Sequence, residues 1–404
     1  MLAAVLAIAW GAPSPARAAN QEDLEQRIKL LEQALGELKS QLTEVKVTQA
    51  SEAKVPAWAE RIEFYGDARF RFEDTSYDEF NGKDKDNKDR FRVRLRFGAR
   101  SQIRDDVEVG FRLVTGGDDD PTSTNQTMGN YWAEYTNIGF DRAYVTYTPD
   151  FVPEKGLSFT FGKAANPFKT TYVIWDGDVV PEGAFLKYEF NKAGNITPYA
   201  LVTGLVLQQN QDWSSNVYPW GGQLGVKGKA GIFGFDVATS YLDWQKFGED
   251  GNLPPNIHGN PEYTEGGVTR LSTFKVWDLY GEGSLKFASK GKVGLWGQYL
   301  TNTDATGPYS DKDMGWGAGA FVSWDVFKFK ADYKYLEANA TPGFIADSDS
   351  GYVNREGMTL TFAWKMFKYG TFELKYYDTE PVDDDVPGAT NSSQTIFTDF
   401  IFKF

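Results

Sequence analysis

The last ten residues, TIFTDFIFKF (395–404), decide the fold. Their side chains alternate as in a β-strand, and one face carries Phe400, Phe402 and Phe404. A soluble protein rarely ends on an exposed aromatic strand, because such an edge recruits other chains into aggregates. The same strand is stable where it pairs with the first strand of a closed sheet and turns its aromatic face to lipid. We therefore expect a barrel-closing strand; an ordinary C-terminal core strand is the alternative.

The composition favours a membrane barrel. The chain has 404 residues, of which 16% are aromatic, yet its mean hydropathy is −0.46. A barrel has this profile because only alternate residues must be apolar. No stretch approaches the roughly 20 apolar residues of a spanning helix, so any membrane span must be a strand. A net charge of −14 argues against nucleic acid as a partner, and the absence of cysteine excludes disulfides and thiolate chemistry.

A period-two pattern covers the chain from residue 61 onward and predicts an all-β transmembrane barrel of about sixteen antiparallel strands. Each strand has roughly the ten residues that a tilted membrane strand requires. The predicted strands are 62–73, 90–100, 105–116, 138–149, 156–165, 183–191, 195–207, 218–229, 231–245, 272–288, 292–302, 314–325, 327–338, 353–367, 370–379 and 394–404. Short and long connections alternate, as in barrels with short periplasmic turns and long outer loops. An even strand number then places both ends of the barrel on the periplasmic side.

The N-terminal residues have a different character. Residues 1–19 contain a short apolar run and an A-x-A pattern, so we expect a signal peptide, although no Lys or Arg precedes the run. Residues 20–54 predict a periplasmic coiled-coil helix, and residues 55–60 a linker to the barrel at 61–404. The predicted seam consists of Leu24, Ile28, Leu31, Leu35, Leu38, Leu42 and Val45, spaced alternately four and three apart. Three identical helices on a trimer axis are the preferred interpretation, and packing on a neighbouring domain is the alternative.

Residues 61–404 resemble the trimeric outer-membrane porins of Gram-negative bacteria, in particular those that carry an N-terminal coiled coil. The resemblance rests on the closing strand, the alternating connections and the strand number. It implies a homotrimer in which each barrel holds a water-filled channel, and a third long loop, here 165–182, that folds into the lumen and narrows it. It also implies insertion by the barrel assembly machinery and contact with outer-membrane lipid and lipopolysaccharide. The helix would lie in the periplasm, where peptidoglycan is a candidate partner.

Arginines recur at every second residue on one face of the first strands. Because apolar residues alternate with them, they would cost about 2–4 kcal/mol each if they faced lipid near the midplane, so we expect them in the lumen. This basic ladder consists of Arg69, Arg71, Arg90, Arg92, Arg94, Arg96, Arg112 and Arg142. The resemblance places the acids of the third loop, Asp176, Asp178 and Glu182, opposite the ladder. The field between them would order water and hinder uncharged apolar solutes. The alternative is that the arginines stay hydrated and pair with neighbouring acids.

Three functions follow from these features. The leading hypothesis is a general-diffusion porin for ions and small hydrophilic solutes, constricted by the third loop. The ladder motivates a second, a substrate-selective channel for anions such as phosphate, which the loop acids oppose. The coiled coil motivates a third, a tether within the cell envelope. We expect neither enzymatic activity nor a cofactor or metal, because the single histidine, His258, has no partner pattern and no metal ligands cluster.

Overall fold

The computed structural model describes residues 21–52, 59–78, 86–117, 120–129, 137–210, 215–249, 252–254 and 256–404. The predicted signal peptide and most of the predicted linker lie outside these residues. Two compact units make up the chain, Met1–Glu60 and Arg61–Phe404.

The first unit contains the helix α1 (Gln21–Glu52), which is 32 residues long. Its apolar residues recur four and three apart, so they share one side of the helix. The side chains of Ile28, Leu31, Leu35 and Leu38 are 51% to 69% exposed, so this stripe is not packed against other described residues of the unit. Within the described part of the chain, no helix combines the length and the apolar character needed to cross a membrane.

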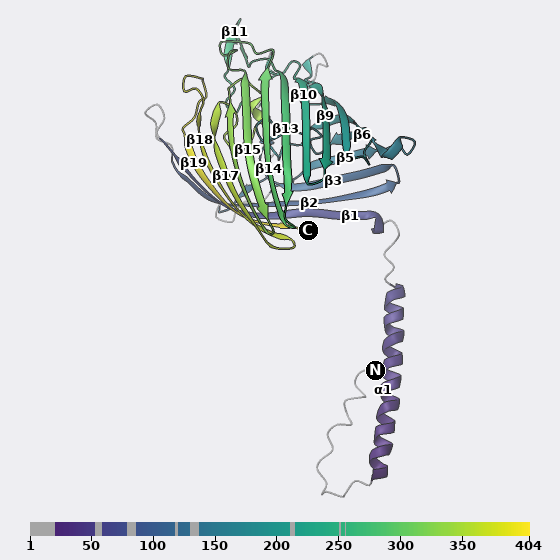
Figure 1. The fold of residues 1–404 in the computed structure, drawn as a ribbon. Coiled ribbons are helices and arrows are strands. Elements are labelled where there is room, and N and C mark those ends of the chain that lie inside the picture. Colours follow the sequence, from purple (N-terminus) through teal and green to yellow (C-terminus); the bar gives the residue numbers. More distant parts are fainter. Residues whose placement is uncertain are drawn as a thin grey trace. The chain divides into compact units, whose positions relative to one another are not determined.

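Within the described residues, sixteen long strands of the second unit form one antiparallel sheet that closes on itself (Figure 1). In chain order they are β1 (Ile62–Tyr77), β2 (Lys88–Arg104), β3 (Val107–Thr115), β5 (Ile138–Tyr147), β6 (Leu157–Lys163), β7 (Glu182–Glu189), β8 (Ile196–Leu205), β9 (Trp220–Ala230), β10 (Phe233–Asp243), β13 (Lys275–Phe287), β14 (Gly291–Asn302), β15 (Met314–Trp324), β16 (Phe327–Leu336), β17 (Arg355–Phe367), β18 (Gly370–Pro381) and β19 (Ser393–Lys403). Closure occurs because β1 pairs with both β2 and β19, from Asp67 opposite Lys403 to Tyr77 opposite Ser393. The predicted all-β barrel of about sixteen antiparallel strands is confirmed.

The two ends of the barrel differ in the length of their connections. At one end the strands are joined by short turns, such as 105–106, 231–232 and 325–326. At the other end the connections are long, and we name them in chain order L1 (78–87), L2 (116–137), L3 (164–181), L4 (206–219), L5 (244–274), L6 (303–313), L7 (337–354) and L8 (382–392). The C-terminus lies at the short-turn end, opposite the L5 hairpin of β11 (Tyr263–Glu265) and β12 (Val268–Arg270) (Figure 1). In outer-membrane barrels the end with the short turns is the periplasmic one.

The outer face carries two bands of aromatic side chains. Trp316 and Trp324, at the two ends of β15, belong to different bands. Trp316 stacks on Tyr333 and Trp324 packs on Phe287, and in each pair the ring centroids are 5.5 Å apart. Eight residues of strand cover about 27 Å, or about 20 Å along the membrane normal at a tilt of about 40°. This height is close to the ~25 Å apolar band of outer-membrane barrels, with aromatic girdles at both interfaces.

Loops L3, L5 and L7 fold into the lumen and build an apolar core with the barrel wall. Val173 and Trp175 of L3 are buried there together with Trp244 of L5 and Ile345 of L7. The rings of Trp175 and Trp244 lie 6.1 Å apart. Gly317 of β15 makes room for this core, since a Cβ at that position would collide with the Cγ2 of Val173. The inner face of the barrel is therefore apolar beneath these loops.

Candidate functional site

Arginines line the inner face of β1 and β2. Cross-strand pairing sets Arg69 opposite Arg94 and Arg71 opposite Arg92. These positions alternate with lipid-facing residues such as Phe91, which is 63% exposed, whereas Arg71 is 1% exposed. Like charges opposite each other on neighbouring strands destabilise a sheet, so this arginine wall requires anionic partners.

Arg71 is held from two sides. Its Nε and Nη2 donate to the two carboxylate oxygens of Asp399 on β19 at 2.8 and 2.9 Å. Its Nη1 lies 3.3 Å from an oxygen of Asp349 in L7, and its guanidinium carbon lies 3.9 Å from the ring centroid of Phe397. A bidentate contact fixes the orientation of a guanidinium as well as balancing its charge. Arg71 thereby joins the closing strand to L7.

Two further arginines of the wall share one acid. The Nη2 of Arg90 and the Nη1 of Arg92 lie 2.7 and 3.4 Å from the carboxylate of Glu73. The Nη2 of Arg92 also donates to the hydroxyl of Ser123 in L2 at 3.1 Å. This part of the wall therefore carries more positive than negative charge.

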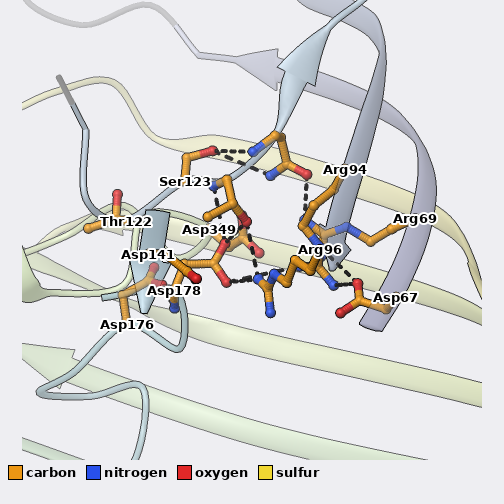
Figure 2. A network of polar contacts seen from close by, with 12 residues as sticks. Asp67, Arg69, Arg94, Arg96, Thr122, Ser123, Asp141, Asp176, Asp178 and Asp349 are labelled. Carbon is orange, nitrogen blue, oxygen red and sulfur yellow. Dashed lines mark hydrogen bonds and ion pairs between the residues drawn. The ribbon is translucent and has the colours of Figure 1, made fainter. Parts of the chain in front are cut away.

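L3 meets the wall at Asp178 (Figure 2). Arg96 forms a close ion pair with Asp178, and the Nη1 of Arg94 lies 3.9 Å from the same carboxylate. Thr124 of L2 donates its hydroxyl to Asp178 at 3.1 Å, and Arg94 donates to Asp67 at 2.6 and 3.1 Å. Burial alone would raise the pKa of Asp178, but Arg96 and Arg94 hold that pKa below its ordinary value. Asp178 is therefore ionised where it touches the wall.

L2 runs over the arginine wall, a feature that the sequence interpretation missed. Its two-residue strand β4 (Gln126–Thr127) pairs with β2 at Arg92. Asn125 accepts a hydrogen bond from Arg69 at 2.6 Å. The stretch TSTNQT (122–127) has a hydrogen-bonding side chain at every position. That run, next to a strand rich in arginine, is the pattern that could have indicated a polar lining segment.

Asp176 belongs to L3, as Asp178 does, but it does not face the arginine wall. Its backbone N–H donates to the carbonyl of Ile345 at 2.7 Å, and its carboxylate accepts a hydrogen bond from the backbone N–H of Ser348 at 3.1 Å. Both partners belong to L7, so Asp176 joins two loops. Burial, together with Asp347 and Asp178, raises the pKa of Asp176 to about 9. At neutral pH this carboxyl is protonated and adds no charge to the channel.

The other predicted site residues lie apart from this contact. Glu182 belongs to the start of β7, where it pairs with Lys163 at 2.8 Å and is 53% exposed, so the expectation that it faces the ladder is wrong. Arg112 donates its Nε to Asp141 at 2.9 Å, an acid that a register shift between β3 and β5 turns inward. Arg142, the cross-strand neighbour of Arg112, makes no side-chain hydrogen bond or ion pair with any residue that the structure describes.

L7 is the third loop that enters the site, after L3 and L2. Lys334 of β16 is buried and donates its Nζ to the carbonyls of Ser350 and Tyr352 at 3.1 and 3.0 Å. Tyr352 in turn stacks on His258 of L5, with ring centroids 4.1 Å apart. These contacts hold L7 where Asp349 reaches the wall. The acidic composition of L7 indicates only a solvated loop when it is read alone, so the sequence did not single it out.

Polar hollows flank the place where L3 meets the wall. One of about 530 Å³ is lined by Arg90, Asp349 and other residues of β1, β2 and L7. Another of about 600 Å³ is lined by Asp178 and Lys163 along L2 and L3. Charged and hydrogen-bonding groups that line a hollow inside a barrel suit hydrated solutes.

Comparisons with known proteins agree with this architecture. Residues 82–257 match a protein family described as "Putative porin". The fold is that of OmpF from Salmonella typhi, solved with daunomycin, at a TM-score of 0.52 and 11% identity over 85% of this chain and 97% of that one. It is also that of the outer membrane channel DcaP of Acinetobacter baumannii, at a TM-score of 0.50 and 10% identity over 85% and 97% of the two chains. No curated protein matches the sequence. Over residues 82–257 the chain is therefore similar to porins, and its barrel has the fold of these outer-membrane channels.

Proposed function

We propose that this protein is a passive general-diffusion porin whose channel is narrowest where L3 meets the arginine wall. The observation that carries the proposal is the course of L3 across the lumen. Its Val173 packs beside Gly317 of β15, and its Asp178 contacts Arg96 of β2. In the closed sheet, β2 and β15 are separated by β1, β19, β18, β17 and β16 on the shorter path. A loop that contacts both must divide the lumen.

The charges at this contact suggest how solutes are screened. Arg94 and Arg96 of the wall lie against the ionised Asp178 of L3, so solutes would pass beside this contact and not between its charges. Fixed charges of opposite sign at the edge of a narrow passage orient water and polar solutes, whereas apolar uncharged solutes lose hydration without compensation. Small ions and hydrophilic molecules would therefore pass through the polar hollows beside L3.

Planar-bilayer recording on the purified protein tests this function. A general-diffusion porin gives discrete conductance steps that grow in proportion to the KCl concentration, and a reversal potential that shows weak ion preference. Current that saturates with one anion, together with strong anion preference, would instead support a substrate-selective channel. The absence of conductance steps would contradict both.

The helix motivates a second proposal, a periplasmic tether built on a homotrimer. The exposed stripe of α1, with Leu31 69% and Leu35 59% exposed, is typical of a helix that packs against copies of itself. Three such helices on the axis of a trimer would bury the stripe and leave charged flanks for peptidoglycan or a protein partner. Lipid, lipopolysaccharide and the barrel assembly machinery remain the partners expected for the barrel.

Deleting residues 20–54 separates the two roles. If the helices only tether, the shortened protein should still conduct and migrate as a trimer, while the outer membrane detaches from the cell wall. If the helices hold the trimer, the shortened protein should migrate as a monomer. An unchanged envelope and an unchanged trimer would contradict both roles of the helix.

A further inference from the structure

Arg142 differs from the other seven arginines of the ladder. Each of those donates to, or pairs with, a carboxylate or amide oxygen of another residue. Among the described residues, Arg142 has no such partner, and its Nε is buried without an acceptor. An arginine that keeps its charge without a carboxylate is costly unless water or a ligand supplies the acceptor.

Arg142 lines a hollow of about 220 Å³ inside the barrel together with Lys187 of β7. The hydroxyls of Tyr144, Ser158 and Thr160 belong to the same lining, and none of the described lining residues is acidic. The hollow therefore presents two cations and several hydroxyl groups without a carboxylate of its own.

The hollow lies on the periplasmic side of L3. Thr146 and Ser158, which line it, are close to the turn 148–156 that joins β5 to β6 at the short-turn end. Ala165 and Pro167 of L3 line it as well. A solute that passes L3 from outside would therefore reach this hollow after the contact between Asp178 and the wall.

The acids nearest to the hollow are already occupied. Asp141 accepts from the Nε of Arg112 at 2.9 Å. Glu189 lies 2.5 Å from the Nζ of Lys227 and 3.7 Å from that of Lys187. Glu108 accepts from the hydroxyl of Tyr144 at 3.0 Å, and among the described residues no carboxylate forms an ion pair with Arg142.

We infer that this hollow is a binding subsite for a small oxyanion, a carboxylate or a phosphate, on the periplasmic side of L3. Arg142 presents a planar set of donors that matches either group, and Lys187 adds a second charge. The volume accommodates inorganic phosphate or a short carboxylate with a few waters. The inference rests on the proposed channel function and adds to that channel a site where one class of solute binds in passing, without the strong anion preference of a substrate-selective channel.

Single-channel recording in KCl with added sodium phosphate tests the subsite. Phosphate should reduce the chloride current in a saturating manner in the wild-type protein. In the variants Arg142→Gln and Lys187→Gln, the half-saturating phosphate concentration should rise about tenfold, because each variant removes one charged hydrogen-bonding group. Arg142→Lys, which keeps the charge but not the planar fork, should restore part of the affinity. Lys290→Gln is the matched control, since Lys290 lies in the turn between β13 and β14, where it pairs with Asp325 at 2.9 Å, and it should leave the half-saturating concentration unchanged.

Sodium acetate and sodium succinate form the second arm of the experiment. Saturation by phosphate alone assigns the site to phosphate, whereas saturation by acetate and succinate as well assigns it to oxyanions generally. A wild-type channel that conducts KCl but saturates with none of these anions would overturn the subsite and leave the porin function intact. Equal losses in Lys290→Gln and Arg142→Gln would also overturn it. A protein that folds into the membrane yet gives no conductance would overturn the proposed function itself.

Discussion

Asp176 and Asp178 are two residues apart on L3, but their surroundings keep the carboxyl group of Asp176 neutral and that of Asp178 ionised. Both are buried, which favours the neutral form. Arg96 and Arg94 overcome this effect at Asp178 and hold its pKa below the ordinary value. Among the described residues, no arginine forms an ion pair with Asp176, and burial raises its pKa to about 9. In a narrow channel a single fixed charge affects which ions pass, so of these two acids only Asp178 should affect ion selectivity at neutral pH.

Replacing Asp178 by asparagine should shift the channel toward anions. The substitution keeps the size of the side chain but removes the negative charge beside Arg94 and Arg96, and it should weaken the attachment of L3 by about 2 kcal/mol. The reversal potential in a KCl gradient measures the shift. Asp176→Asn is the control and should leave the reversal potential unchanged at neutral pH. Equal shifts in the two variants would show that the assigned charge states are incorrect.

The carboxyl of Asp176 should make the contact between L3 and L7 sensitive to pH. Its pKa of about 9 in the folded protein exceeds the ordinary carboxyl value of about 4, so folding retains a proton that the unfolded chain releases. The stability that this proton provides is full below about pH 4 and is lost as the pH rises toward 9. Burial raises the pKa of Asp347 as well, which acts in the same direction.

Gel assays of heat-induced unfolding measure this dependence. The temperature at which the folded band disappears should fall between about pH 5 and pH 9. In Asp176→Asn the fall should be smaller, because one of the two titrating groups is gone. A variant that follows the wild-type curve over the whole range would contradict the protonated state of Asp176.

At the scale of elements, the strands were predictable and the positions of the loops were not. Alternation of side chains is a local property, so the predicted strand 314–325 closely matches β15 (Met314–Trp324). The position of L7, in contrast, depends on contacts between residues far apart, such as Arg71 and Asp349, which are separated by 278 positions. The resemblance to porins placed Asp178 opposite the arginine ladder. The contacts of L2 and L7 with the arginine wall can be seen only in the folded chain. The apolar core beneath L3 also depends on contacts between residues far apart in the sequence, so local alternation does not predict it.

Gly317→Val should displace L3 from the barrel wall. A branched side chain at this position of β15 would collide with Val173, which is fully buried, and overpacking of this kind costs about 1–3 kcal/mol. The temperature of heat-induced unfolding should fall, and the single-channel conductance should change because the loop moves. Gly281→Val is the matched control, since a Cβ there meets no atom within 4 Å. An identical effect of both substitutions would contradict the packing of L3 on β15.

Lys334→Met should release L7 from the wall. The carbonyls of Ser350 and Tyr352 would lose a buried charged donor, which costs about 1–3 kcal/mol for each group left unpaired. Limited proteolysis should then cut within 337–354 faster than in the wild-type protein. Lys328→Met, on the same strand, removes an equal charge, which lies 5.2 Å from the ring centroid of Phe321, and it should not change the cleavage rate. Resistance of L7 in both variants would contradict the anchoring role of Lys334.

At the scale of the whole molecule, closure of the sheet creates a lumen, and L3 crosses that lumen. Pairing of β1 with β19 leaves the barrel without free edges, so its outer face can meet lipid over the full circumference. The lumen then holds every polar group that cannot face lipid, including the arginine wall. L3 runs across this lumen from the apolar core at β15 to the ion pairs at β2. We therefore propose L3 as the element that narrows the channel.

Single-channel conductance of the wild-type protein and of a variant with a short Gly-Ser linker in place of residues 172–179 tests this claim most directly. If L3 narrows the channel, the wild-type protein gives discrete conductance steps and the variant gives clearly larger ones, with the barrel still folded in the gel assay. Steps of equal size in the two proteins, or a folded wild-type barrel that does not conduct at all, would contradict it.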